Sequence, residues 1–388
     1  MLSSNRIHQL SLLFLTAFLP LLVRGLVVPE VDVPGTVGFL SMAALLFGLP
    51  FVPFWGAWAE RYSRKAIIVR SAVVEALLFG LIGLATGIGQ VAILVPLVGL
   101  NLGNTGVMLA EITDRTPRLR LAFAISLVGT AGPLGFAVGP ALGGFVADRV
   151  GVQPLLVIDA LATLVVIGLL LVFYHEDRTR PRSPLGVRAL VRRALGAVVR
   201  SRLTRLVFLT YFLVLFGQRA VSPFLALWVE ELNGPAMLAT TVGIVAGLYG
   251  LAAAVGSPIA GAAGGRIGVR RVLLWAIAWS ALGAAIVALV PGLLPFAIVY
   301  AALGIGFATT GSMLFTTLAT GLPGEIRASV LSLALVPLYL SGISGSFAAT
   351  RLLEVTSGDL RPLWLVTAFA VGLALVPAWR LQIGRAHV

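Results

Sequence analysis

Ionisable side chains inside long apolar runs are the residues of this sequence best suited to chemistry. They are Arg24, Arg70, Glu75, Asp159 and Arg219. At membrane depth a charged residue costs at least about 2.5–3.5 kcal/mol, so each is a candidate for substrate binding or proton transfer. A carboxyl group can take up and release a proton, and an arginine can hold an anionic group. For Glu75 and Asp159, a structural role as the partner of an arginine or a backbone group stays open.

Sequence patterns for other kinds of chemistry do not occur. There is no cysteine, which excludes disulfides and thiolate metal sites. The histidines His8, His175 and His387 lie near predicted membrane edges or chain ends. HExxH, P-loop and GxSxG motifs are missing, so an ATP-driven pump is excluded for this chain alone. We therefore expect no enzyme activity, no metal site and no cofactor.

The composition indicates that most of the chain lies in lipid. Hydrophobic residues make up 59% of it and charged residues only 11%, with a mean hydropathy of +1.03. A soluble domain carries roughly 25% charged residues to wet its surface. The net charge of +13 fits basic loops beside an anionic inner leaflet better than it fits nucleic-acid binding.

About a dozen apolar runs approach the roughly 20 residues that cross a bilayer core. They cover residues 8–28, 35–57, 66–87, 91–111, 121–146, 152–174, 204–229, 236–262, 271–290, 295–319, 328–350 and 361–380. An even number of spans places both termini on one side, and the distribution of arginines makes that side the cytoplasm. The arginine-rich composition indicates a bacterial source. We predict a multi-pass protein of the cytoplasmic membrane.

A basic stretch divides the chain into two parts. After Pro181 and Pro184, arginines alternate with Leu and Val from Leu185 onward, which predicts an amphipathic helix on the inner leaflet. We predict an N-terminal six-helix half over 1–174, a linker over 175–203 and a C-terminal half over 204–382. The fold class is thus all-α, with about 12 transmembrane helices in two pseudo-symmetric halves.

The two halves repeat short patterns at one constant spacing. Thr36-Val37-Gly38 returns as Thr241-Val242-Gly243, Pro53 as Pro258, Gly56 as Gly261 and Arg61 as Arg266. Internal repeats of this length are typical of secondary transporters, whose substrate site lies between the halves near the midplane. The repeat therefore predicts a transporter of small molecules.

The loop after the second run reads GAWAERYSRK at residues 56–65. It resembles motif A of the major facilitator superfamily, GxxxDRxGRR/K, with Glu for Asp and Ser for the second glycine. The second copy, from Gly261 to Arg271, has Gly265 in place of the acid. The resemblance covers nearly the whole chain and implies the fold of that superfamily.

Motif A implies a conformational latch. Gly56 would let two helices approach closely, and Glu60 would accept hydrogen bonds from Arg61 or from a facing helix N-terminus. The latch set is Gly56, Glu60, Arg61, Arg64, Lys65, Gly261 and Arg266. Alternatively, these charges only fix the topology.

The fifth run contains GFAVGPALGG at residues 135–144. It resembles motif C, GxxxGPxxGG, which marks proton-coupled antiporters of the superfamily and so implies export rather than uptake. The motif residues are Gly135, Gly139, Pro140, Gly143 and Gly144. The glycines would open a groove for a neighbouring helix, and the proline would permit a bend.

In the resembled fold, helices 1, 4, 7 and 10 line the cavity. The predicted cavity residues are Arg24, Asn101, Asn104, Met108, Gln218, Arg219, Tyr249 and Met313. The arginine that the family often carries in its fourth helix is missing here, so the proton route does not transfer, and Glu75 and Asp159 are the proton-coupling candidates. Two cationic cavity residues would favour substrates with an anionic or zwitterionic part.

The resulting prediction is a monomeric exporter of amphiphilic molecules or drugs, driven by proton antiport with alternating access. The alternative is a metabolite or sugar transporter of the same fold. Residues 383–388 can be encoded by a string that resembles a sequencing adapter. We therefore expect this tail to be non-native and the natural chain to continue beyond about Leu381.

Overall fold

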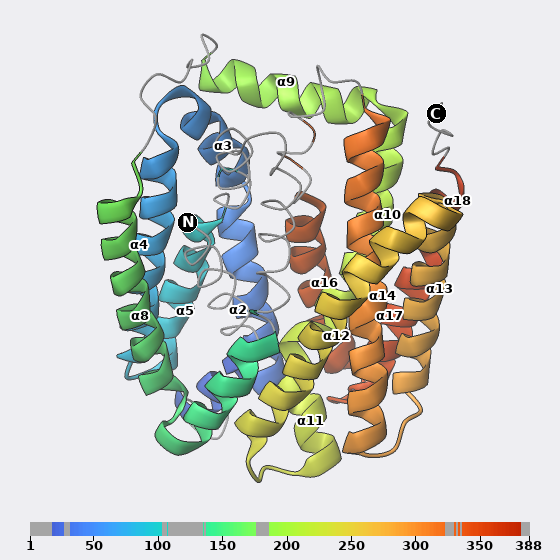
Figure 1. The fold of residues 1–388 in the computed structure, drawn as a ribbon. Coiled ribbons are helices and arrows are strands. Elements are labelled where there is room, and N and C mark those ends of the chain that lie inside the picture. Colours follow the sequence, from blue (N-terminus) through green and yellow to red (C-terminus); the bar gives the residue numbers. More distant parts are fainter. Residues whose placement is uncertain are drawn as a thin grey trace.

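The structure is a computed structural model that describes residues 18–26, 32–102, 107, 135, 137–175, 186–322, 330, 333 and 336–381. Within this part of the chain every regular element is a helix (Figure 1). Seven helices are long and apolar enough to cross a membrane, or up to eight if the bent pair Val33–Gly48 and Phe51–Ala59 is one span. The all-helical, multi-pass fold is confirmed, and the count of 12 stays a prediction.

The helices before residue 187 form the N-terminal group. They are a helix over 18–26, α2 (Val33–Gly48), α3 (Phe51–Arg61), α4 (Arg64–Gly83), α5 (Ile88–Val98) with the 3₁₀ turn η1 (Gly99–Asn101), a helix over 137–150, and α8 (Val152–Phe173). Within this group α4 packs against α8 and α5, and α2 packs against α5.

Helix α9 (Val187–Arg200) and the C-terminal group follow. The group comprises α10 (Arg202–Val221), η2 (Ser222–Phe224), α11 (Leu225–Asn233), α12 (Leu238–Ile267), α13 (Val269–Val287), α14 (Leu293–Gly321), α16 (Val336–Val355), α17 (Arg361–Leu373) and α18 (Leu375–Trp379). Here α14 packs against α12 and α13, and α10 packs against α16 and α17. The limits predicted for the two halves stay a prediction.

Local sequence signals set several helix ends. The Ser63 hydroxyl accepts from the Ala66 N–H at 3.0 Å, and the Ser201 hydroxyl accepts from the Thr204 N–H at 3.2 Å, so each serine caps a helix N-terminus. Gly268 joins α12 to α13 at a φ of 97°. This left-handed conformation favours glycine and lets the chain turn within one residue.

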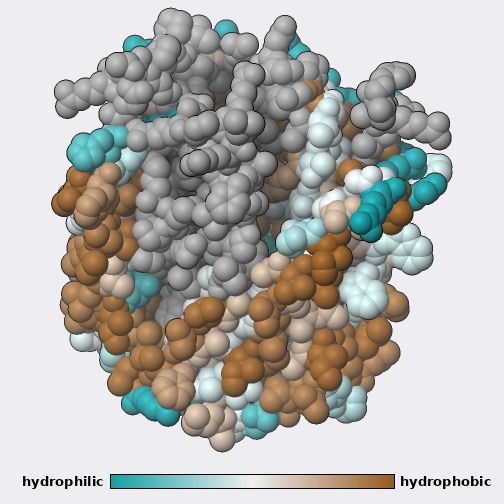
Figure 2. All heavy atoms as spheres, in the orientation of Figure 1, coloured by the Kyte–Doolittle hydropathy of each residue, from teal (hydrophilic) through white to brown (hydrophobic). Residues whose placement is uncertain are grey.

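The flanks of the molecule are covered with apolar side chains, and hydrophilic ones lie toward its ends (Figure 2). Trp275 is 75% exposed, Phe369 73% and Leu289 81%. Large exposed apolar residues in such numbers are unfavourable in contact with water but favourable in contact with lipid tails. This surface agrees with the composition.

Helix α9 lies across one end of the bundle, and α11 lies at the opposite end (Figure 1). We call these the α9 end and the far end. The two groups meet through α2 of the N-terminal group and α16 of the C-terminal group. They also meet through the helix over 137–150 and α12, as the glycine contacts below show.

Candidate functional site

At the far end an ion pair joins the two groups. The guanidinium of Arg24, on the helix over 18–26, binds the carboxylate of Glu230 on α11. The Arg24 side chain is 41% exposed. In this conformation the charge of Arg24 is balanced at one end of the bundle, and its place in the cavity stays a prediction.

A second polar contact between the groups lies close by. The carboxylate of Asp148 accepts the N–H of Ala239 at 3.1 Å and the N–H of Thr240 at 2.7 Å. These are among the first N–H groups of α12, so Asp148 caps a helix of the other group and complements its dipole. Sequence reasoning missed both Asp148 and Glu230. Their signal was that acidic residues collect just after predicted spans.

The motif C helix packs against α12 with backbone contact. A methyl group at Gly144 would lie 2.1 Å from the Ala239 carbonyl oxygen, and one at Gly243 would lie 2.1 Å from the Pro140 carbonyl oxygen. Such distances exclude any side chain, so these glycines set the spacing of the two helices. Gly135 and Gly143 are also buried, and Gly139 is half-buried.

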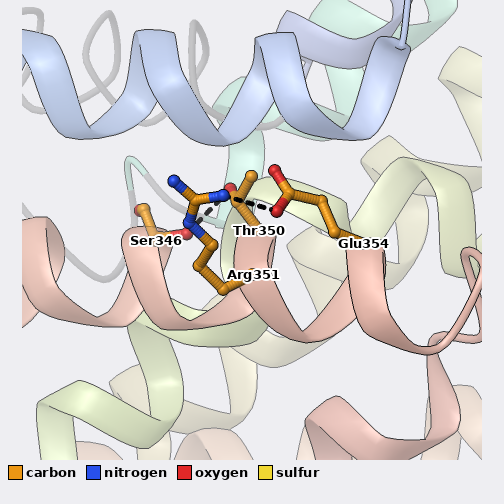
Figure 3. Close-up of polar contacts among 4 residues, drawn as sticks. All are labelled: Ser346, Thr350, Arg351 and Glu354. Atoms are coloured by element: carbon orange, nitrogen blue, oxygen red, sulfur yellow. Dashed lines mark hydrogen bonds and ion pairs between the residues drawn. The ribbon is translucent and has the colours of Figure 1, made fainter.

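The repeat-related contact on the other side of the molecule joins α2 and α16. A methyl group at Gly38 would lie 1.7 Å from the Thr350 hydroxyl oxygen. That hydroxyl donates to the Ser346 carbonyl at 2.9 Å, with Arg351 as the next residue of α16 and Glu354 one turn further along (Figure 3). Gly38 and Gly243 occupy equivalent positions of the internal repeat, and each lies between the two groups.

The motif A residues lie at the α9 end. Lys65 donates to the Leu171 carbonyl at 3.2 Å, at the C-terminus of α8, where a cation is favoured. Arg64 is buried, and Arg61 lies 5.5 Å from the ring of Tyr62. The side chain of Glu60 lies outside the described part of the chain, so its role as a latch stays a prediction.

The motif A glycines are not close-packed in this conformation. A methyl group at Gly56 or at Gly261 would meet no heavy atom of the described residues within 4 Å. The expectation that Gly56 lets two helices approach closely stays a prediction. Arg266 lies in the last turn of α12, at the same end of the bundle.

The proton-coupling candidate Glu75 lies beside a predicted cavity residue. The Asn101 amide donates to the Glu75 carboxylate at 2.9 Å, and both residues are fully covered. Asn101 thus directs its amide at Glu75, and its place in the cavity stays a prediction. Asp159 is half-buried on α8, the helix that packs against α4. Asn104 and Met108 lie outside the described residues.

Arg70 is held by several groups of its own half. Its guanidinium donates to the Ser71 hydroxyl at 2.8 Å and to the Leu102 carbonyl at 3.5 Å, and it lies 3.9 Å from the ring of Trp55. A cation over an aromatic face is stabilised by the ring quadrupole. Arg70 therefore links α4 to α3 and to the chain just after η1.

Three predicted cavity residues come together in the C-terminal group. Gln218 donates to the Tyr249 hydroxyl at 2.6 Å. Next to Gln218, the half-buried Arg219 lies within electrostatic range of the hydroxyls of four tyrosines. These are Tyr211 on α10, Tyr249 on α12, Tyr300 on α14 and Tyr339 on α16. We call Arg219 and these four residues the arginine–tyrosine cluster; the sequence analysis found Arg219 and Tyr249 and missed the other three.

Met313 was also predicted to line the cavity, but it is buried between α14 and α12. A methyl group at Gly264 would lie 3.2 Å from its sulfur atom. Methionine is adaptable and often fills gaps of this kind. In this conformation the side chain contributes to helix packing, and its place in the cavity stays a prediction.

Comparisons with known proteins were made for the whole chain. The family model of the Major Facilitator Superfamily matches residues 10–240 and 207–386. The multidrug resistance protein MdtG of Citrobacter koseri is 32% identical over 267 residues, which cover 67% of this chain and 64% of that protein. MdtG of Salmonella heidelberg is 28% identical over 369 residues, covering 93% of this chain and 89% of that one.

Among solved structures, a mutant of the nucleoside transporter NupG superposes with a TM-score of 0.77 at 14% identity, covering 97% of this chain and 98% of that one. This likeness concerns the fold alone. The match to the Citrobacter protein spans slightly less than two thirds of that protein's length.

Proposed function

This chain belongs to the major facilitator superfamily of transporters, and on that premise we propose that it exports amphiphilic small molecules in exchange for protons. Two of the similar proteins are the multidrug resistance protein MdtG of other bacteria, which supports export of drug-like compounds. The motif C glycines, typical of antiporters, support the same direction of transport.

One observation carries the mechanism. The contacts that close the far end are made between the two groups, by Arg24 with Glu230 and by Asp148 with the N-terminus of α12. Both are polar contacts, which water can replace when the groups separate. Closure at one end by breakable contacts is what alternating access requires, because the substrate path must open to one side at a time. With a cytoplasmic N-terminus, the far end is the outer end.

Glu75 is our candidate for the proton-carrying group. It is a carboxyl group at membrane depth, fully covered, and it accepts a hydrogen bond from Asn101. Changes in helix packing between conformations would alter this hydrogen bond and the burial, and with them the ease of protonation. Proton uptake at this site would then favour one conformation over the other.

The test uses everted membrane vesicles from a host without its own efflux pumps, with an imposed pH gradient and an acid-quenched dye. We expect amphiphilic drugs to cause proton release, and Glu75→Gln to abolish it. Glu354→Gln, an equal change at an exposed carboxylate, should leave the release intact. No proton release with drugs, but proton release on adding a sugar or small metabolite, would favour the alternative, a sugar or metabolite transporter. Release that survives Glu75→Gln would remove Glu75 from the proton route.

A further inference from the structure

We propose that the arginine–tyrosine cluster binds the oxyanion group of an amphiphilic substrate, so that the preferred substrates are aryl or alkyl carboxylates and related anions. This inference rests on the proposed transport function and names the class of substrate. It is carried by the arginine itself, by the residues around it and by the contrast with the other arginines at membrane depth.

Arg219 occupies the middle third of the membrane-spanning segment Arg202–Asn233. Its Nε atom is buried and has no hydrogen-bond acceptor among the described residues. No carboxylate of the described part of the chain forms an ion pair with it. A guanidinium at this depth needs an acceptor, because burying an unbalanced charge is costly.

The other membrane-depth arginines have partners of other kinds. Arg24 is neutralised by Glu230. Arg70, whose Nε and Nη1 atoms are also buried without a hydrogen-bond partner among the described residues, has a backbone carbonyl, a hydroxyl and an aromatic face. Arg219 instead interacts electrostatically with tyrosines of four helices, and one of these, Tyr249, is hydrogen-bonded to the adjacent Gln218. Tyrosine hydroxyls are neutral and donate hydrogen bonds, so they support an anion beside the arginine without competing for its charge.

The neighbouring rings suit the apolar part of such a substrate. Tyr249 and Tyr300 have ring centroids 4.9 Å apart, and Tyr300 stacks on Phe296 at 5.4 Å. The Tyr300 ring also meets Trp364 edge-on at 6.1 Å. Phe296 and Trp364 are buried and hold Tyr300 in place, whereas the Tyr300 ring is half-buried. This ring offers a face to a flat or apolar body that carries one anionic group, and the arginine offers a fork of donors to that group.

The test measures binding by calorimetry to the full chain in lipid nanodiscs, with no pH gradient. The probes are 1-naphthylacetate and its neutral amide, 1-naphthylacetamide, which differ only in the anionic group. We expect the acetate to bind about tenfold or more tightly than the amide, because a hydrogen bond to a charged group contributes about that much. Arg219→Gln should lower acetate affinity to that of the amide and leave amide affinity unchanged.

Two further variants guard against a folding defect. Arg219→Lys keeps the charge and should retain part of the preference for the acetate, and Tyr300→Phe removes one hydroxyl and should weaken acetate binding alone. Arg351→Gln makes the same change as Arg219→Gln at an arginine that is 64% exposed and paired with Glu354 (Figure 3), and should have no effect.

The proposal is overturned if the native chain fails to bind the acetate, binds both probes equally, or loses affinity for both equally in Arg219→Gln. These outcomes do not depend on transport. Proton release in vesicles, together with equal affinity for the acetate and the amide, would therefore contradict this inference alone. Tighter binding of the acetate without any transport would contradict the proposed function alone.

Discussion

Arginine side chains at membrane depth are compensated in three different ways in this structure. Arg24 has a carboxylate, Arg70 has an aromatic face with a carbonyl, and Arg219 has tyrosine hydroxyls. Some of these partners lie near the arginine in the chain, such as Ser71 for Arg70 and Tyr211 for Arg219, and others lie far from it. A sequence therefore shows that such residues need partners, but it does not show which partners they have, because Arg24 and Glu230 lie far apart along the chain.

Glycine contacts give a prediction at the same scale. Gly144→Ala places a methyl group 2.1 Å from the Ala239 carbonyl oxygen, which is backbone and cannot move aside alone. We expect a loss of about 1–3 kcal/mol, since overpacking forces a backbone shift. Thermal unfolding in detergent, followed by circular dichroism, measures it.

Gly56→Ala is the matched control, because a methyl group there meets no described atom within 4 Å. Its unfolding temperature should stay the same or rise slightly, since alanine favours a helix over glycine by about 1 kcal/mol. Equal behaviour of the two variants would contradict the backbone contact between the motif C helix and α12.

At the scale of elements, the spans were predictable and their breaks were not. The run predicted over 204–229 is α10, η2 and α11, which together extend over Arg202–Asn233. Pro223 lies in the 3₁₀ turn that interrupts it. The run over 35–57 bends between α2 and α3, at Pro50. Hydropathy gives the length of a span, but how the helix deviates at a proline depends on the neighbouring helices.

The cap on α12 is tested by Asp148→Ala. The first N–H groups of the helix lose their acceptor from the other group, and we expect about 0.5–2 kcal/mol less stabilisation of the far-end contact. Hydrogen exchange at Ala239 and Thr240 measures the effect, and it should become faster in the variant.

Asp359→Ala serves as the comparison, because Asp359 accepts from the backbone of Arg361 within its own group. Exchange at residues 239 and 240 should stay at the native rate in this variant. An unchanged rate in Asp148→Ala as well would show that Asp148 does not hold the two groups together.

At the scale of the whole molecule, the two groups meet at paired helices that the internal repeat relates. The repeat was visible in the sequence, and it placed Gly38 and Gly243 at equivalent positions before their contacts were known. The sequence did not reveal that, among the described residues, the ion pair of Arg24 and the helix cap by Asp148 both join the groups at the far end. That arrangement belongs to one conformation of the transporter, and a single sequence encodes all of its conformations.

Alternating access predicts opposite distance changes at the two ends. The chain has no cysteine, so spin labels can be placed at will. Val150→Cys with Met237→Cys reports on the far end, and Tyr62→Cys with Ile267→Cys reports on the α9 end, all at exposed positions. Double electron–electron resonance should show one pair lengthening as the other shortens when pH is changed. Parallel changes, or none, would contradict rocking of the groups.

Helix α9 touches both groups in unequal ways. Toward the C-terminal group, only Ser201 separates α9 from α10, and this serine caps the N-terminus of α10. Toward the N-terminal group, α9 packs against α3. Helix α9 is therefore covalently fixed to the C-terminal group and only packed against the N-terminal group. It is about 21 Å long for its 14 residues. If the two groups rock as the proposed mechanism requires, α9 must slide along α3 or separate from it. The energy of the contact between α9 and α3 then slows one half of the transport cycle, whichever substrate is transported.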